Sequence, residues 1–311
     1  MITSFRKAIL SMPSSVLPVF AVLCVITFSS LFFLIGFKIE LAYFSLDYKC
    51  FSRLINDGNN PLFVPVLRYF MALQTIALFG IAPLTIAWVY RKKADSLYLL
   101  NKKPTLYFLL LSICFIILVN PFINLLMEFN GNIMDALLGA SNSLKDQDLS
   151  TQKIVESLLK DTSFSALLIN AIVIAFLPAA LEELFFRGLL QKVVLSKYMN
   201  SHMAILSTAF LFSFIHFQFY GFLPRFVLGV AFGYILLWTG SLWVTICIHF
   251  ANNFMAVFVQ NLISRQLLSE SINTVGTNQT SWIGFLSAIV AAFLLWMLFR
   301  KYQQSNDYKP T

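Results

Sequence analysis

Long apolar runs separated by polar connections dominate this chain of 311 residues. A helix needs roughly 20 mostly apolar residues to cross the hydrocarbon core of a bilayer. Eight runs qualify, at approximately 14–37, 66–90, 105–127, 163–186, 203–220, 222–239, 241–263 and 281–300. The pattern therefore predicts an all-α, polytopic transmembrane helical bundle with about eight spans.

The composition agrees with lipid as the main solvent of the chain. Hydrophobic residues make up 59% and charged residues 12%, whereas soluble domains carry about 25% charged residues. The net charge of +8 arises from bases that flank the apolar runs, not from basic stretches interleaved with aromatics. We therefore exclude nucleic acid as a partner and expect the lipid bilayer instead.

Basic residues gather in the even-numbered connections and in both tails. They are Arg6, Lys7, Arg91, Lys92, Lys93, Lys102, Lys103, Lys192, Lys197, Arg300, Lys301 and Lys309. The third connection is acidic, and the first is balanced, with Lys38, Lys49 and Arg53 against Glu40, Asp47 and Asp57. Because cytoplasmic loops carry an excess of Lys and Arg, we predict that both termini are cytoplasmic. The lack of eukaryotic sorting signals favours a bacterial inner (plasma) membrane.

This pattern divides the chain into four parts. Residues 1–130 form an N-terminal three-span scaffold, whose spans contain no acid and no histidine. Residues 131–162 form a polar outer loop with a short amphipathic helix near Ile154, which could lie on the membrane surface. Residues 163–265 form a helical core that carries the candidate chemistry, and residues 266–311 form the C-terminal span and a cytoplasmic tail.

Two adjacent acids, Glu182 and Glu183, stand inside an apolar stretch that also contains Arg187. An ionisable group in the bilayer costs several kcal/mol, so these residues are expected to face the interior of the protein. Glu183 and Arg187 are four residues apart and can pair on a helix, while Glu182 lies about 100° round it. Taken alone, the run could also consist of interfacial charges that reach water.

Histidine and asparagine form two more clusters. His216 ends the run Phe212-Ser-Phe-Ile-His, and His249 lies one helical turn before Asn253 in the seventh run. Such residues often serve as interhelical hydrogen-bonding groups. However, two of the three histidines of the chain lie inside predicted spans, which favours a functional role. The third, His202, lies at a loop end and is predicted to be a bystander.

These residues form a complete catalytic set. Glu182 supplies a carboxylate in apolar surroundings, suited to a general base, and His216 can share its water molecule. His249 and the amide of Asn253 are donors suited to an oxyanion. No serine, cysteine or lysine stands at a nucleophile position, so the set predicts attack of an activated water on an acyl carbon, which is amide hydrolysis.

The three motifs together are similar to those of the CAAX protease and bacteriocin-processing (CPBP, or Abi) family, related to type II CAAX prenyl endopeptidases. The matching runs are Glu182-Glu183-Leu-Phe-Phe-Arg187, Phe212-Ser-Phe-Ile-His216 and His249-Phe-Ala-Asn-Asn253. The resemblance covers roughly residues 163–265. It implies that Glu182 and His216 activate the water, that His249 and Asn253 stabilise the oxyanion, and that Glu183 and Arg187 give structural support.

We therefore expect an intramembrane-sited peptidase that hydrolyses a peptide bond of a membrane-associated peptide or protein. The alternatives are a non-catalytic membrane scaffold or bacteriocin-immunity protein, and a proton-coupled transporter, which buried acids and histidines also build. No cofactor is expected, because no HExxH motif is present. The alternative is a divalent metal such as Zn²⁺, with Glu182, His216 and His249 as ligands.

Overall fold

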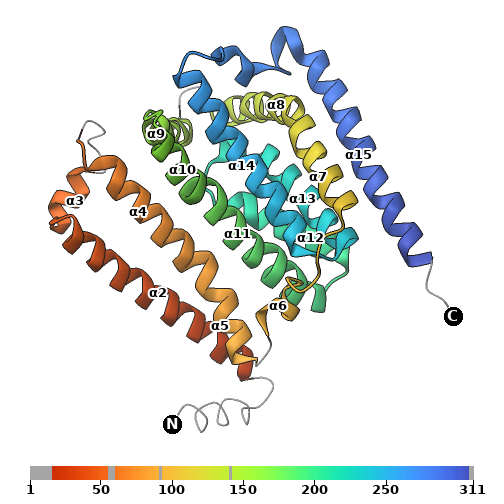
Figure 1. Ribbon diagram of the computed structural model, residues 1–311, viewed down its shortest axis with the longest axis horizontal. Helices are drawn as coiled ribbons and strands as arrows, with labels where there is room; N and C mark the ends of the chain where they lie inside the picture. Colours follow the sequence, from red (N-terminus) through yellow and green to blue (C-terminus); the bar gives the residue numbers. More distant parts are fainter. Residues whose placement is uncertain (1–15, 55–59, 91–92, 140–141, 308–311) are drawn as a thin grey trace.

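The computed structural model describes residues 16–54, 60–90, 93–139 and 142–307, and every regular element within them is helical (Figure 1). In this described part, six helical segments are long and apolar enough to cross a membrane. They are Pro18–Tyr43, Phe63–Val89, Phe164–Lys197, Phe219–Thr239, Leu242–Ser264 and Asn278–Ser305. Two further helices, bent by 46° at their junction, make a seventh span if they are counted together. The predicted all-α, polytopic membrane fold is confirmed.

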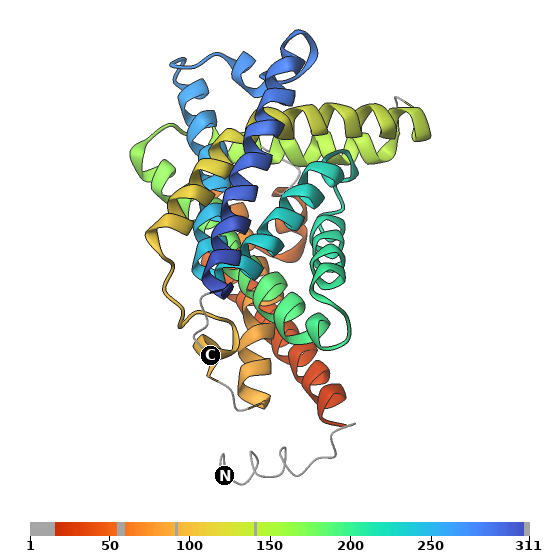
Figure 2. The same ribbon diagram turned by 90° about the vertical axis from the view of Figure 1, so that its right-hand side faces the viewer.

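The fifth predicted run differs from a full span. Its helix, α12 (Ser201–Phe214), has only 14 residues, and the chain turns directly after it, where Phe217 takes a φ of +52°. The helix formed by this run is therefore shorter than the roughly 20 residues needed to cross the hydrocarbon core of a bilayer. Both ends of the described chain lie in the same half of the molecule (Figure 2), and their predicted cytoplasmic orientation stays a prediction.

The N-terminal part is a helical hairpin. Its first arm is α2 (Leu17–Tyr43), and its second arm consists of α4 (Phe63–Thr75), the π-helical η1 (Ile76–Gly80) and α5 (Ile81–Val89). The short α3 (Tyr48–Leu54) lies at the hairpin's closed end (Figure 1). The aromatic ring of Phe37 packs against Phe51, with centroids 4.9 Å apart. Aromatic contacts within the N-terminal part thus help to hold the hairpin together.

Glu40 corrects one prediction for this hairpin. The apolar pattern assigns it to the first connection, but α2 continues to Tyr43, so Glu40 lies within the helix and is 0% exposed. Both carboxyl oxygens lack a hydrogen-bond partner among the described residues. Its neighbours on α2, Phe37 and Leu41, pack in an apolar cluster with Phe51 of α3 and Phe63 of α4.

Replacing Glu40 with Met is expected to stabilise the protein by about 1–3 kcal/mol, the cost of leaving a buried polar group unsatisfied. The midpoint of thermal unfolding in detergent measures this change. The matched control is Glu156→Met at an exposed site, where we expect a change within about 0.5 kcal/mol. A lower midpoint for Glu40→Met would show that this carboxyl has a stabilising partner.

Two helices lie across one end of the bundle instead of along it. The first is α8 (Asn120–Leu138), which follows α7 (Leu106–Leu118) and has Pro121 as its second residue, and the second is α9 (Ser143–Leu159). Figure 2 shows both lying across the direction of the long helices. The predicted polar loop 131–162 is therefore largely helical, and residue 130 lies within α8.

The C-terminal core is built around one continuous helix, Phe164–Lys197, of 34 residues. Around it stand α12, α13 (Phe222–Thr239) and α14 (Leu242–Ser264), while α15 (Ser281–Asp307) closes the far side (Figure 1). Buried residues of α7, α13, α14 and α15, with Val119 at the junction of α7 and α8, form the largest apolar cluster of the described residues: Phe115, Ile116, Val119, Ala231, Phe232, Ile235, Val244, Ile248, Ala291, Leu294 and Leu298. Short helices join these elements: α6 (Ala94–Leu97), η4 (Leu195–Lys197), η5 (Phe219–Gly221), η6 (Glu270–Thr274) and η7 (Asn278–Thr280).

Candidate active site

The long helix changes its winding around the two acids. After α10 (Phe164–Asn170) it is π-helical over η2 (Ala171–Phe176), α-helical over α11 (Leu177–Glu183) and π-helical again over η3 (Leu184–Val194). Pro178 has no N–H to continue an α-helical ladder, which accounts for a break near η2. Because the helix runs on to Lys197, Glu182 and Glu183 lie near its middle. There the side chains of α14 and of the shorter helix α12 can reach them.

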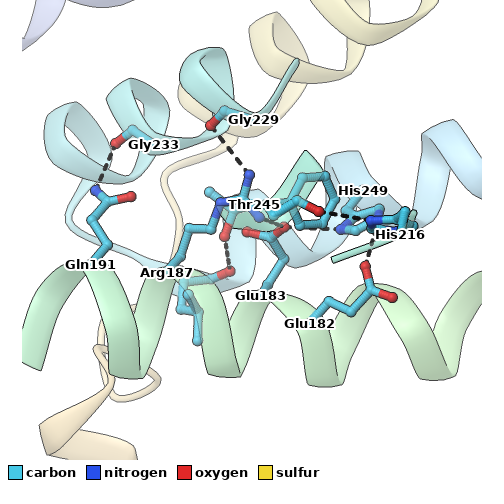
Figure 3. A network of polar contacts seen from close by, with 11 residues as sticks. Glu182, Glu183, Arg187, Gln191, His216, Gly229, Gly233, Thr245 and His249 are labelled. Atoms are coloured by element: carbon cyan, nitrogen blue, oxygen red, sulfur yellow. Dashed lines mark hydrogen bonds and ion pairs between the residues drawn. The ribbon is translucent and has the colours of Figure 1, made fainter. Parts of the chain in front are cut away.

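Glu183 is the centre of a buried polar network. Its Oε1 atom lies 2.9 Å from Nη1 of Arg187, one turn further along the helix, and 2.9 Å from Nδ1 of His249 on α14. Glu183 and Arg187 are both 0% exposed. The predicted pairing of Glu183 with Arg187 is present, and the same carboxylate also fixes the ring of His249 (Figure 3).

Arg187 is enclosed by α12 and α13. Its guanidinium carbon lies 4.7 Å from the ring centre of Phe212 and 5.5 Å from that of Phe232, at the distance of cation–π contacts. Its Nη2 donates to the carbonyl of Gly229 at 3.2 Å. A Cβ at Gly229 would lie 3.1 Å from that of Ala209, so glycine allows α12 and α13 to approach this closely.

Glu182 approaches the same histidine from the other side. The Oε2 atom of Glu182 lies 3.8 Å from Nε2 of His249, and Glu182 is 9% exposed. His249 thus stands between two adjacent acids, with Nδ1 towards Glu183 and Nε2 towards Glu182 (Figure 3). Since Nδ1 contacts the carboxylate that Arg187 neutralises, we assign it as a donor to Glu183.

His216 lies beside this pair. It lies two residues after the end of α12, and its Nδ1–H donates to the carbonyl of Phe212 at 2.7 Å. In the neutral ring this leaves Nε2 with its lone pair as an acceptor. Figure 3 shows His216 next to His249 on the side of Glu182. The ring of Phe212 packs against both histidines, with its centroid 5.1 Å from that of His216 and 6.0 Å from that of His249.

A cavity of about 360 Å³ brings these groups together. Its polar lining includes all four predicted catalytic residues, Glu182, His216, His249 and Asn253. Its remaining lining residues are Val155, Leu159, Ile174, Pro178, Phe212, Arg225, Leu228, Phe232, Asn252, Ala256 and Val257. The site is therefore a largely apolar chamber with a few convergent polar groups, which is typical of a substrate site.

Asn253 and His202 take no part in the hydrogen bonds around Glu183. Asn253 lines the cavity one turn beyond His249, and its Oδ1 accepts a 3.3 Å hydrogen bond from the amide of Asn252. His202, predicted to be a bystander, is exposed and bonds instead to the hydroxyl of Tyr234 at 2.8 Å. It is not part of the cavity lining.

Two arginines inside predicted spans, Arg68 and Arg225, were not among the predicted site residues. Arg68 donates from Nε to Asn170 at 2.9 Å, and the amide of Asn170 donates to the carbonyl of Leu158 at 3.0 Å. This chain of bonds holds the end of α9 beside the cavity, where Leu159 forms part of its lining. Arg225 lines the cavity itself. A charged residue within an apolar run was the available signal for both.

The donor set does not fit a metal ion. Within the described residues, no group of three or more His, Cys, Asp or Glu side chains is arranged to hold one. One nitrogen of His249 is engaged with Glu183, and the other faces Glu182. We therefore derive no step through a metal, and the expected independence from metal stays a prediction.

Residues 164–255 match the family described as type II CAAX prenyl endopeptidase Rce1-like. The matched segment contains all three motifs and every cavity residue except Val155, Leu159, Ala256 and Val257. The resemblance to CAAX proteases is therefore confirmed over this segment, and it supports a protease in an integral, multi-pass membrane protein. No curated protein and no solved structure matches the chain.

Proposed function

We propose that this chain is an intramembrane-sited peptidase that hydrolyses a peptide bond of a membrane-associated peptide or protein. The observation that carries the proposal is the placement of Glu182 3.8 Å from His249, in one cavity with His216 and Asn253. A general base must lie within reach of the proton that it takes, and an oxyanion needs fixed donors near the reacting carbonyl. The cavity lining holds the carboxylate of Glu182 together with His249 and Asn253, which supports the proposal.

In the proposed reaction, Glu182 takes a proton from a water molecule while the water oxygen attacks the carbonyl carbon of the substrate. The lone pair on Nε2 of His216 holds the second hydrogen of that water. The carbonyl oxygen gains the electron pair and becomes the oxyanion. When the C–N bond breaks, the proton on Glu182 passes to the leaving nitrogen, which gives a carboxylic acid and an amine.

The oxyanion is stabilised by His249 and Asn253 in this proposal. His249 already donates from Nδ1 to Glu183, so a second N–H at Nε2 requires the doubly protonated ring. Glu183 and Glu182 flank that ring with two carboxylates, and Arg187 holds Glu183 in place. Glu183 and Arg187 therefore act as positioning residues, which orient His249 without touching the substrate.

Exhaustive chelation is expected to leave the activity unchanged, because the proposed base and donors are side chains alone. The measurement is the rate of peptide hydrolysis before and after treatment with a strong chelator, followed by elemental analysis of the protein. A metal-dependent peptidase treated in the same way serves as the control. Loss of activity together with a stoichiometric metal that His249→Ala also removes would contradict the metal-free mechanism.

The proposed activity is tested with purified protein in lipid nanodiscs and an equimolar mixture of twelve-residue peptides. The reaction is run in ¹⁸O-labelled water, and mass spectrometry identifies the products. New C-termini that carry one ¹⁸O atom are the expected result, since the attacking oxygen comes from water. A folded preparation, with cooperative thermal unfolding, that yields no new termini would contradict the proposal for soluble and lipid-bound peptides of this length.

A further inference from the structure

A second cavity of about 300 Å³ adjoins the catalytic one beneath α9. We call it the α9 cavity, and its lining is Met127, Lys145, Asp148, Leu149, Thr151, Gln152, Val155, Gln218, Tyr220, Gly221 and Arg225. It shares Val155 and Arg225 with the catalytic cavity. A chain that leaves the catalytic cavity on this side therefore passes between α9 and the start of α13.

One of the three charges in the α9 cavity is already neutralised. The ammonium of Lys145 lies 2.9 Å from the carboxylate of Asp135, and this hydrogen bond raises the pKa of Lys145. The hydroxyl of Tyr220 also donates to Asp135, at 2.7 Å. Lys145 therefore belongs to the contact that joins α8 to α9, and Asp148 and Arg225 remain as the charges that can serve a ligand.

Asp148 and Arg225 are each only partly satisfied. Asp148 accepts the backbone N–H of Tyr220 at Oδ2, at 2.8 Å, while its Oδ1 has no hydrogen-bond partner among the described residues. Arg225 donates from Nη1 to the side chain of Gln218 at 2.7 Å and from Nη2 to the Gln218 carbonyl. Its Nε likewise lacks a partner in the described structure.

An unsatisfied donor and an unsatisfied acceptor of opposite charge select a neutral ligand. An anion would be attracted by Arg225 and repelled by Asp148, and a cation would meet the reverse. A peptide amide carries one C=O and one N–H, so it can satisfy both groups without a net charge. Buried polar groups are usually paired in folded proteins, and a bound amide would supply both missing partners.

We propose that the α9 cavity is a subsite that binds amide groups of the substrate next to the scissile bond. Arg225 donates to an amide oxygen, and Asp148 accepts from an amide N–H. This inference rests on the proposed peptidase function. The enzyme is then an endopeptidase whose substrate continues in an extended form beneath α9. Peptides that have only one residue on that side of the scissile bond are expected to be poor substrates.

The test uses a Glu182→Gln background, in which binding is measured without turnover. The probe is an equimolar mixture of twelve-residue peptides that each carry one benzophenone group, and photo-crosslinked protein is quantified. Asp148→Ala and Arg225→Gln are each expected to lower capture about tenfold, which is the effect of one hydrogen bond to a charged group. Asp146→Ala, the same change at an exposed position of α9 outside both cavity linings, is expected to leave capture unchanged.

A second arm keeps the protein unaltered in case Arg225→Gln does not fold. Peptides with methylated main-chain amides are expected to lose capture, because they lack the N–H that Asp148 accepts. Peptides without Asn and Gln are expected to retain it, which assigns the amide to the main chain. Capture by N-methylated peptides, or equal capture by Asp148→Ala and the parent protein, overturns the subsite.

The two proposals fail separately in these experiments. Hydrolysis by protein with Glu182 and no effect of Asp148→Ala on capture would overturn the subsite and leave the peptidase. Capture that depends on Asp148 without any hydrolysis would support the subsite and overturn the peptidase. No capture at all in the Glu182→Gln protein would overturn the subsite regardless of hydrolysis.

Discussion

Replacing Glu182 with Gln is expected to lower kcat by about 10²–10⁴-fold, the range that general-base catalysis contributes. Gln keeps the size of the side chain and its oxygen, but it cannot take the proton of the attacking water. The polar network around Glu183 is expected to stay intact in this variant, because Arg187 and His249 contact Glu183 and not Glu182 for that network. KM is therefore expected to change little.

The measurement is steady-state kinetics on a peptide that the wild-type protein cleaves. Glu270→Gln, on the exposed helix η6, is the control and is expected to keep full activity. Thermal unfolding of the Glu182→Gln protein separates a chemical defect from a folding defect. An unchanged kcat would remove Glu182 from the mechanism.

Replacing Arg187 with Met is expected to destabilise the protein by about 3–5 kcal/mol, because it leaves the carboxylate of Glu183 buried without its cation. Both partners are 0% exposed, and their atoms lie 2.9 Å apart. The change also removes the guanidinium from between Phe212 and Phe232. Activity is expected to fall as well, because the ring of His249 depends on Glu183 for its orientation.

The free energy of unfolding in a mild detergent tests this expectation. Lys192→Met, an exposed change on the same helix, is the control and is expected to alter stability by no more than about 0.5 kcal/mol. The double variant Glu183→Gln with Arg187→Met is expected to recover part of the loss, because it leaves no buried charge unpaired. Equal stability of Arg187→Met and wild type would show that Glu183 has another partner.

Most of the helices could be predicted from the apolar runs, because lipid requires both length and continuous hydrophobicity. The fifth run shows where this reasoning ends. Its apolar residues continue past Phe214, but the helix stops there and the chain turns through Phe217. Composition alone does not record such a turn. Glu40 could not be placed for a similar reason, since other helices decide whether a charge at a helix end meets water.

The residues of the candidate site could be predicted from the sequence, but the contacts between them could not. Motifs on three helices identified Glu182, His216, His249 and Asn253, and the structure places all four on one cavity. The bond between Glu183 and His249 joins residues 66 positions apart, and helical spacing gives no information at that distance. Arg225 differs from these cases, because its charge within a predicted span was visible in the sequence and could have marked it.

The most direct test of the central claim is a comparison of peptides from cells that express either the wild-type protein or Glu182→Gln at equal levels. Mass spectrometry of membrane and soluble fractions measures the abundance of every new peptide terminus. If Glu182 activates water for peptide hydrolysis, a defined set of termini appears with the wild type and is absent with the variant. Identical sets of termini in the two cell lines would contradict a peptidase built on Glu182.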